Sequence, residues 1–140
     1  MKRFKFNLEK VLQLRQFKEE ECKLALGQAI SALNKIENDI KETALKRYNA
    51  NAQRFNDTME MLSWENYIVR LDLETEQLTE KAAQAQIVVE QKRAIYMEAL
   101  RDLKAIEKLK EKQKQEYRKE VLYDEMNQVD ELTTSRMMFG

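Results

Sequence analysis

The feature that most constrains the fold is a repeat of apolar residues at alternating spacings of four and three. In an α-helix this spacing gathers the residues into one stripe, and a stripe kept over several heptads is typical of a coiled-coil seam. The first seam consists of Cys22, Leu26, Ala29, Leu33, Ile36 and Ile40. The apolar members of the second seam are Met61, Trp64, Ile68, Leu71, Leu78, Ala82, Ala85, Val89, Tyr96, Ala99, Leu103 and Ile106.

Composition favours the same class of fold. The chain of 140 residues contains no proline and two glycines, and 36% of its residues are charged. Strong helix formers dominate, and the residues that usually mark turns between short elements are scarce. We therefore expect an all-α protein without a wide globular core.

The seams are separated by a polar stretch. Residues 48–58 contain three asparagines and an aspartate, which compete with helical hydrogen bonds and favour turns or helix caps. We place a turn within about 54–63. The sequence then predicts two long helices forming an antiparallel coiled-coil hairpin, as a single elongated unit over residues 1–140.

A rival interpretation is one continuous helix that pairs with a second chain. The heptad frame runs through the polar stretch without a break, which keeps this alternative open. A parallel dimer would however bury Arg47, Arg54 and Asp57 opposite their own copies. On this alternative the protein is a structural dimeric scaffold or tether, whereas the hairpin is expected to be a monomer.

Charge is balanced overall but not locally. Lysine plus arginine and aspartate plus glutamate number 25 each, so nucleic acid is not an expected partner. Residues 1–18 and 101–120 are basic, and residues 56–80 are acidic. Beyond 110 the seam fades, and a shifted stripe appears in a helical C-terminal segment. This stripe consists of Leu122, Met126, Val129 and Leu132.

The sequence contains few of the residues and motifs that usually support catalysis. Histidine is absent, no glycine-rich phosphate loop occurs, and Cys22 lies on the first seam, where a structural thiol is expected. We predict no catalytic residue, cofactor or metal site. Without an apolar run of about 18 residues or a signal peptide, we expect a cytoplasmic protein that does not insert into membranes.

The opening stretch FKFNLEKVLQLR, residues 4–15, combines two aromatics with a helix start. Asn7 is a suitable N-cap, and Phe6 and Val11 then occupy the two positions of a hydrophobic staple. Phe4 lies outside this motif and is free to pack on Leu8 or to contact a partner. Gly27 interrupts the first seam stretch, and its missing side chain would allow close approach of the other helix or of a partner.

Three segments resemble the FliJ family of flagellar type III export proteins. The first is FKFNLEKVLQLRQFKEEECKLALGQA, and the second is SWENYIVRLDLETEQL, with Trp64, Asn66 and Tyr67 at the family's Trp-x-Asn-Tyr positions. The third is the charged C-terminal segment with Asp130 and Glu131. The resemblance covers essentially the whole chain.

The resemblance implies a non-enzymatic coiled coil similar to the rotor stalk of F- and V-type ATPases. It also implies that the protein lies at the cytoplasmic base of the flagellar export apparatus. Its implied partners are the flagellar export ATPase hexamer, the cytoplasmic domain of the export gate and export chaperones, with rotation inside the ATPase ring left open. By likeness to a stalk, the end with both termini would enter the ATPase. The ATPase-binding candidates are Lys2, Arg3, Phe4, Lys5, Lys10 and Arg15.

The other end of the hairpin is left for the gate. Val69 and Leu73 share one helix face and form an apolar strip bordered by acids, and Leu45 and Tyr48 do the same on the first helix. Tyr48 matches a family tyrosine by its place relative to the turn, whereas Arg70 and Glu74 stand where the family tends to have apolar residues. The gate-binding candidates are Leu45, Tyr48, Tyr67, Val69, Leu71 and Leu73.

Overall fold

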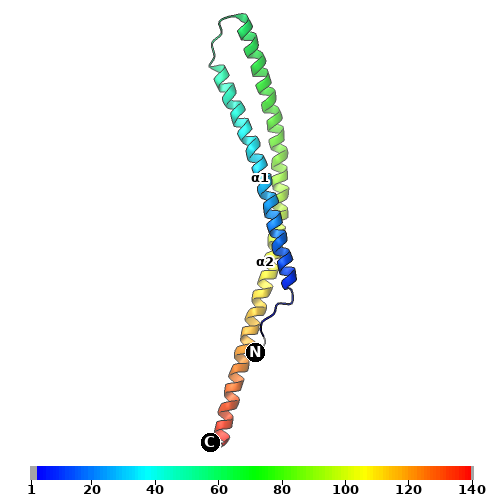
Figure 1. Ribbon diagram of the computed structural model, residues 1–140, viewed down its shortest axis with the longest axis vertical. Helices are drawn as coiled ribbons and strands as arrows, with labels where there is room; N and C mark the ends of the chain where they lie inside the picture. Colours follow the sequence, from blue (N-terminus) through cyan, green and yellow to red (C-terminus); the bar gives the residue numbers. More distant parts are fainter. Residues whose placement is uncertain (1–2, 140) are drawn as a thin grey trace. The chain divides into compact units, whose positions relative to one another are not determined.

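The computed structural model describes the backbone of residues 3–139 and the side chains of residues 3–137. Over this range the chain forms helix α1 (Glu9–Asn51) and helix α2 (Thr58–Phe139), and no strand. A linker of residues 52–57 reverses the direction of the chain between them (Figure 1). The predicted all-α antiparallel hairpin is confirmed, and the single continuous helix is not formed.

The chain divides into two compact units, and each unit contains part of both helices. One combines the chain up to Glu19 with the chain from Glu98 onward, and the other runs from Glu20 to Met97. Because α1 and α2 pack against each other in both, each unit has its own stretch of the apolar seam.

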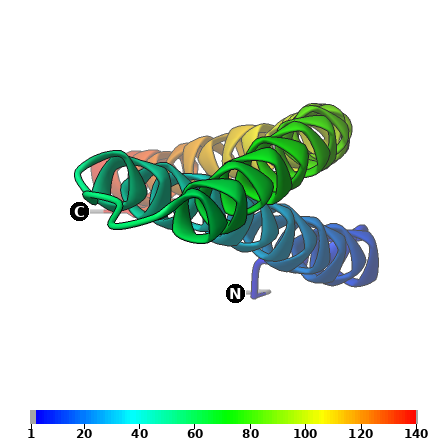
Figure 2. The ribbon, with the colours of Figure 1, turned by 90° about the horizontal axis from the view of Figure 1, so that it is seen from above.

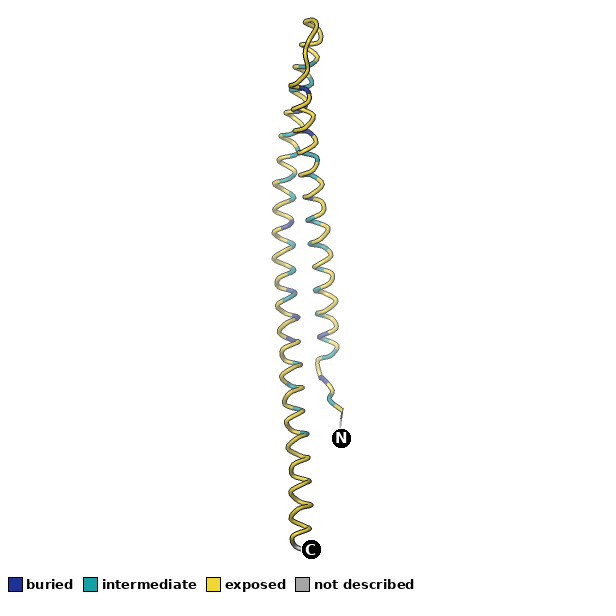
Figure 3. Tube along the Cα trace, turned by 90° about the vertical axis from the view of Figure 1, so that its left-hand side faces the viewer, coloured by how far each residue is buried: buried dark blue, intermediate teal, exposed yellow. Residues whose placement is uncertain are grey.

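In the unit of residues 20–97, the two helices face each other through the predicted stripes. Every residue of the first seam is buried or half-buried, and Leu33 is 9% exposed. From α2, Leu71 and Val89 are 3% and 2% exposed. Figure 3 shows the buried and half-buried residues along the facing sides of the helices and exposed residues elsewhere. The sequence therefore identified the correct face of each helix, except at Met61, which the pattern assigns to the start of the second seam and which is 48% exposed.

The seam extends further toward the linker than the sequence indicated. We ended the first stripe at Ile40, but Thr43 and Ala50 are also buried. The Thr43 hydroxyl Oγ1 donates a hydrogen bond to the carbonyl of Asp39 at 2.9 Å, so its burial leaves no unsatisfied polar group. Arg47 lies between them in the sequence. Its guanidinium stays exposed and pairs with Asp72.

In the other unit, the opening stretch packs on α2. Phe6 and Leu12 form a buried cluster with Leu103 and Ile106, and Phe4 and Val11 pack against it. Helix α1 begins at Glu9, and the amide of Leu12 donates to the carbonyl of Leu8 at 2.9 Å, so the helix starts later than an Asn7 cap would give. Burial against α2 removes more of the Phe6 ring from water than a local staple would.

One ion pair in each unit gives the register of the hairpin. Arg47 pairs with Asp72 at 2.7 Å, and Glu9 pairs with Lys110 at 2.9 Å. Glu9 and Arg47 are 38 residues apart, and so are Asp72 and Lys110. The two helices therefore keep one antiparallel register, without an inserted or deleted residue between these pairs.

The last part of α2 has no packed neighbour. Every side chain from residue 122 to residue 137 is exposed, and the tube in Figure 3 is exposed throughout this stretch. Helix α2 thus continues well past the residues that contact the opening stretch.

Gly27 does not serve as a contact point between the helices. It is exposed, and a Cβ built there would meet nothing within 4 Å. The expectation that α2 approaches closely at this glycine is wrong, because Gly27 lies off the seam on the solvent side of α1.

We therefore expect Gly27→Ala to stabilise the hairpin, because alanine is favoured over glycine by about 1 kcal/mol in a helix interior. Thermal unfolding followed by circular dichroism would show a higher melting temperature. Ser31→Ala, at an exposed position one turn along, is the control and should give a smaller increase. A lower melting temperature for Gly27→Ala would show that the glycine is needed for the native backbone.

Candidate partner-binding surfaces

The basic opening segment presents its cations to solvent. Arg3, Lys5 and Lys10 are exposed, and Lys2 lies outside the described residues. The backbone that carries these side chains is fixed, because Phe6 is buried against α2. The segment therefore holds positive charge at defined positions on the surface of its unit.

Two other candidates in this segment are engaged within the hairpin. The ring of Phe4 lies 5.6 Å from the ring of Tyr117, and Phe4 is half-buried. Arg15 Nη1 donates a hydrogen bond to the carbonyl of Asp102 at 2.9 Å. Phe4 and Arg15 thus fasten the segment to α2, and only the remaining edge of each side chain faces solvent.

Because the basic opening segment packs on a basic part of α2, nearby groups must offset the repulsion between the like charges. Lys110 Nζ contacts Glu9 Oε2 at 2.9 Å and lies 6.0 Å from the centre of the Phe6 ring. The lysine is thereby neutralised by a carboxylate and placed over an aromatic face, both of which favour a cation. The structure brings the two basic stretches together around this contact.

We predict that Phe6→Ala loosens the opening segment. Truncating a buried phenylalanine removes apolar contact with Leu12, Leu103 and Ile106 and should lower the free energy of unfolding by about 3 kcal/mol. Urea denaturation measures the change. Phe17→Ala removes the same side chain from an exposed position of α1 and should cost less than about 0.5 kcal/mol. Equal effects of the two substitutions would contradict a docked segment.

In the unit of residues 20–97, the start of α2 is capped by two side-chain hydrogen bonds. Asp57 Oδ1 accepts a hydrogen bond from the amide of Glu60 at 2.8 Å, and Glu60 Oε2 accepts one from the amide of Asn56 at 2.8 Å. This is a capping box, which satisfies backbone donors that a helix start would otherwise leave free. The aspartate of the polar stretch 48–58, Asp57, is therefore the residue that caps α2.

Trp64 joins the linker to the end of α1. Its indole Nε1 donates to the carbonyl of Ala50 at 2.8 Å, and its ring lies 5.3 Å from that of Phe55 in an edge-on arrangement. The small side chain of Ala50 leaves room for the indole, which explains why Ala50 is only 3% exposed. Figure 2 shows the linker from above, joining the neighbouring ends of the two helices.

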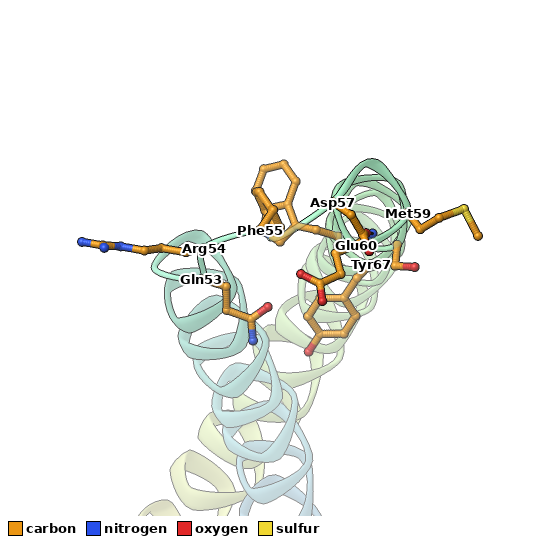
Figure 4. Close-up of a pocket in the computed structure, with 9 residues that line it drawn as sticks. Gln53, Arg54, Phe55, Asp57, Met59, Glu60 and Tyr67 are labelled. Atoms are coloured by element: carbon orange, nitrogen blue, oxygen red, sulfur yellow. The ribbon is translucent and has the colours of Figure 1, made fainter.

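A hollow opens beneath the linker. Tyr67 and Glu60 of α2 point toward Gln53 in the linker, whereas Arg54 and Met59 point away (Figure 4). Its lining residues are Gln53, Arg54, Phe55, Asp57, Met59, Glu60, Ser63, Trp64 and Tyr67. Tyr67 is half-buried here, and the Arg70 guanidinium lies 5.8 Å from the centre of its ring.

Four of the predicted gate residues are apolar and exposed, two on each helix. We call Leu45, Tyr48, Val69 and Leu73 the apolar flank; they are between 54% and 75% exposed. Tyr48 follows Arg47 by one residue, and Val69 precedes Asp72 by one turn, so each helix has a flank residue close to one member of the Arg47–Asp72 ion pair. The flank thus combines exposed apolar side chains on both helices with a nearby charged pair.

Leu71 is placed differently from the other gate candidates. It is 3% exposed and belongs to the seam, so it is not accessible to a partner while the helices are paired. Sequence reasoning also missed Met59 and Leu62, which are 74% and 52% exposed. Met59, Leu62, residue 66, Val69 and Leu73 follow one another at alternating spacings of three and four, which place them on one face of the helix. This periodicity was the signal that could have identified the outward stripe.

The described part of the chain offers neither a membrane span nor a metal site. Neither helix has, within residues 3–139, a stretch that is both long and apolar enough to cross a bilayer. Over the same residues, no three acidic or thiol side chains come together in a way that would hold a metal ion. Cys22 is a free thiol and is half-buried on the seam.

Comparison with known families gives one match. The family described as "FliJ: Flagellar FliJ protein" matches residues 4–138, which is nearly the entire chain. No curated protein and no solved structure matches the chain.

Proposed function

This chain belongs to the FliJ family and is thereby a component of the flagellar export apparatus, and on that premise we propose how it acts. It is a non-enzymatic coupling protein that binds the export ATPase ring through its basic opening segment and the export gate through its apolar flank. The observation that carries the proposal is the family match over residues 4–138. The two surfaces consist of different residues and belong to different units of the chain.

The opening segment supports the ATPase assignment by its charge and its fixed geometry. Arg3, Lys5 and Lys10 are exposed on a segment anchored by Phe6. Clustered cations on a fixed backbone accelerate encounter with an acidic partner, because the attraction acts before contact. Phe4 offers an apolar edge beside them, at the ring pair with Tyr117.

The apolar flank supports the gate assignment by its exposure. Large side chains that remain in water on both helices are typical of a partner surface, with aromatic residues such as Tyr48 as anchors. The nearby Arg47–Asp72 ion pair is exposed, so it adds little stability to the hairpin and is available for polar contacts with the partner.

The same proposal covers location and further partners. The protein acts as a monomeric hairpin at the cytoplasmic side of the export apparatus and also handles export chaperones. It has no catalytic role, which is supported by the absence of histidine from the sequence and by the position of Cys22 on the seam.

Charge reversal tests the ATPase assignment. We expect the triple variant with Arg3→Glu, Lys5→Glu and Lys10→Glu to weaken stimulation of the flagellar export ATPase about tenfold at low salt, and less at high salt. Gate binding, measured separately, should be unchanged. The control reverses three exposed lysines farther along α1: Lys23, Lys35 and Lys41. Unchanged stimulation, or loss of gate binding alone, would assign the ATPase to the other end.

Truncation of the flank tests the gate assignment. Tyr48→Ala combined with Val69→Ala should weaken binding to the cytoplasmic domain of the export gate by at least about tenfold, as expected for a contact centre. Helicity and ATPase stimulation should persist. Leu24→Ala, at a similarly exposed leucine outside the flank, is the control. If the gate binds both variants as it binds the native chain, the flank is not its site.

A further inference from the structure

The end of α2 carries a surface that neither proposed site uses. All side chains from 122 to 137 are exposed, although the segment contains large apolar residues. Leu122, Met126, Val129 and Leu132 are between 59% and 66% exposed. We call these four residues the terminal stripe. Their spacings of four, three and three keep them on one side of the helix across three turns.

The terminal stripe faces a different direction from the seam. Tyr117 marks the seam side of α2 here, because its ring contacts Phe4. Leu122 follows five residues later, and at 100° per residue it is rotated by about 140° around the helix. The opening segment therefore cannot cover the stripe from its docked position. Whatever covers the stripe approaches α2 from another side.

Acidic side chains border the terminal stripe. Glu125 lies three residues after Leu122 and four before Val129, and Asp130 lies four residues after Met126. Residues at these spacings are neighbours on a helix surface. Between residues 120 and 135 no lysine or arginine occurs. The acids of this stretch are Glu120, Asp124, Glu125, Asp130 and Glu131.

These charges decide between the possible occupants. A second copy of the same stripe would bring acids against acids, and like charges beside an apolar seam disfavour pairing. An anionic lipid surface would be repelled for the same reason. A helix with its own apolar stripe and flanking lysine or arginine residues would cover Leu122, Met126 and Val129 and pair with Glu125 and Asp130.

We propose that the terminal stripe is a docking site for a basic amphipathic helix of another protein. The partner lies along α2 over residues 122–132, with apolar side chains in the interface and cations at its edges. Because the stripe and the Phe4–Tyr117 contact lie on different sides of α2, the partner binds without displacing the opening segment. The site is independent of both surfaces assigned above.

Two synthetic peptides test the proposal against the full-length chain. Both are amphipathic helices of about 20 residues with the same leucine stripe, long enough to be helical in water. One has lysine at the flanking positions and the other has glutamate. Fluorescence anisotropy should show that the lysine peptide binds at least about tenfold more tightly, with a preference that decreases as salt is raised.

Variants of the chain locate the binding surface. Glu125→Lys with Asp130→Lys should reverse the preference between the peptides. Asp124→Lys with Glu131→Lys makes the same change in net charge on the opposite side of the helix and should leave the preference in place. Replacing Leu122, Met126 and Val129 with alanine should weaken binding of the lysine peptide about tenfold. The circular dichroism spectrum should still show the same helix content, because alanine favours the helix.

Three results would overturn the proposal. The first is equal binding of both peptides to the native chain. The second is an equal effect of the two lysine pairs, which would reduce the interaction to general electrostatic attraction. The third is concentration-dependent association of the chain, seen by sedimentation and abolished by the triple alanine variant, which would make a second copy the occupant.

Discussion

The apolar seam between α1 and α2 is the contact on which this protein depends. Two helices in a hairpin have only one shared face, so each can bury only the stripe that meets the other. The remaining faces stay in water whatever their sequence. This explains how residues as large as Val69 and Leu73 remain exposed two positions away from buried Leu71. In this architecture, surface available for partners is a consequence of the fold.

A seam this narrow needs its ends secured, because helix ends fray where backbone groups lack partners. At one end the capping box of Asp57 and Glu60 and the indole of Trp64 satisfy polar groups around the linker. At the other, the Phe6 cluster and the Glu9–Lys110 pair hold the opening segment on α2. Both closures combine an aromatic ring, buried for Phe6 and half-buried for Trp64, with charged or polar contacts.

The exposed surfaces differ in chemistry. The opening segment is cationic, the apolar flank has the Arg47–Asp72 ion pair close to it in the sequence, and the terminal stripe is bordered by acids. Since apolar area alone discriminates poorly between partners, these charges are what allow surfaces on one pair of helices to select different proteins. A FliJ-family protein can in this way contact several parts of an export apparatus without a globular domain for each.

The amino-acid sequence by itself determined the helical class, the side of each helix that is buried and the polar break between the seams. These follow from the helical period, which relates residues within one helix whatever surrounds it. Only the tertiary structure decided what each face meets. It placed the linker at residues 52–57, extended the seam through Thr43 and Ala50, docked Phe6 on Leu103, and left Gly27 and the terminal stripe uncovered. The period within a helix carries no information about its register against another helix, because that register is set by the sizes and hydrogen bonds of the side chains that meet.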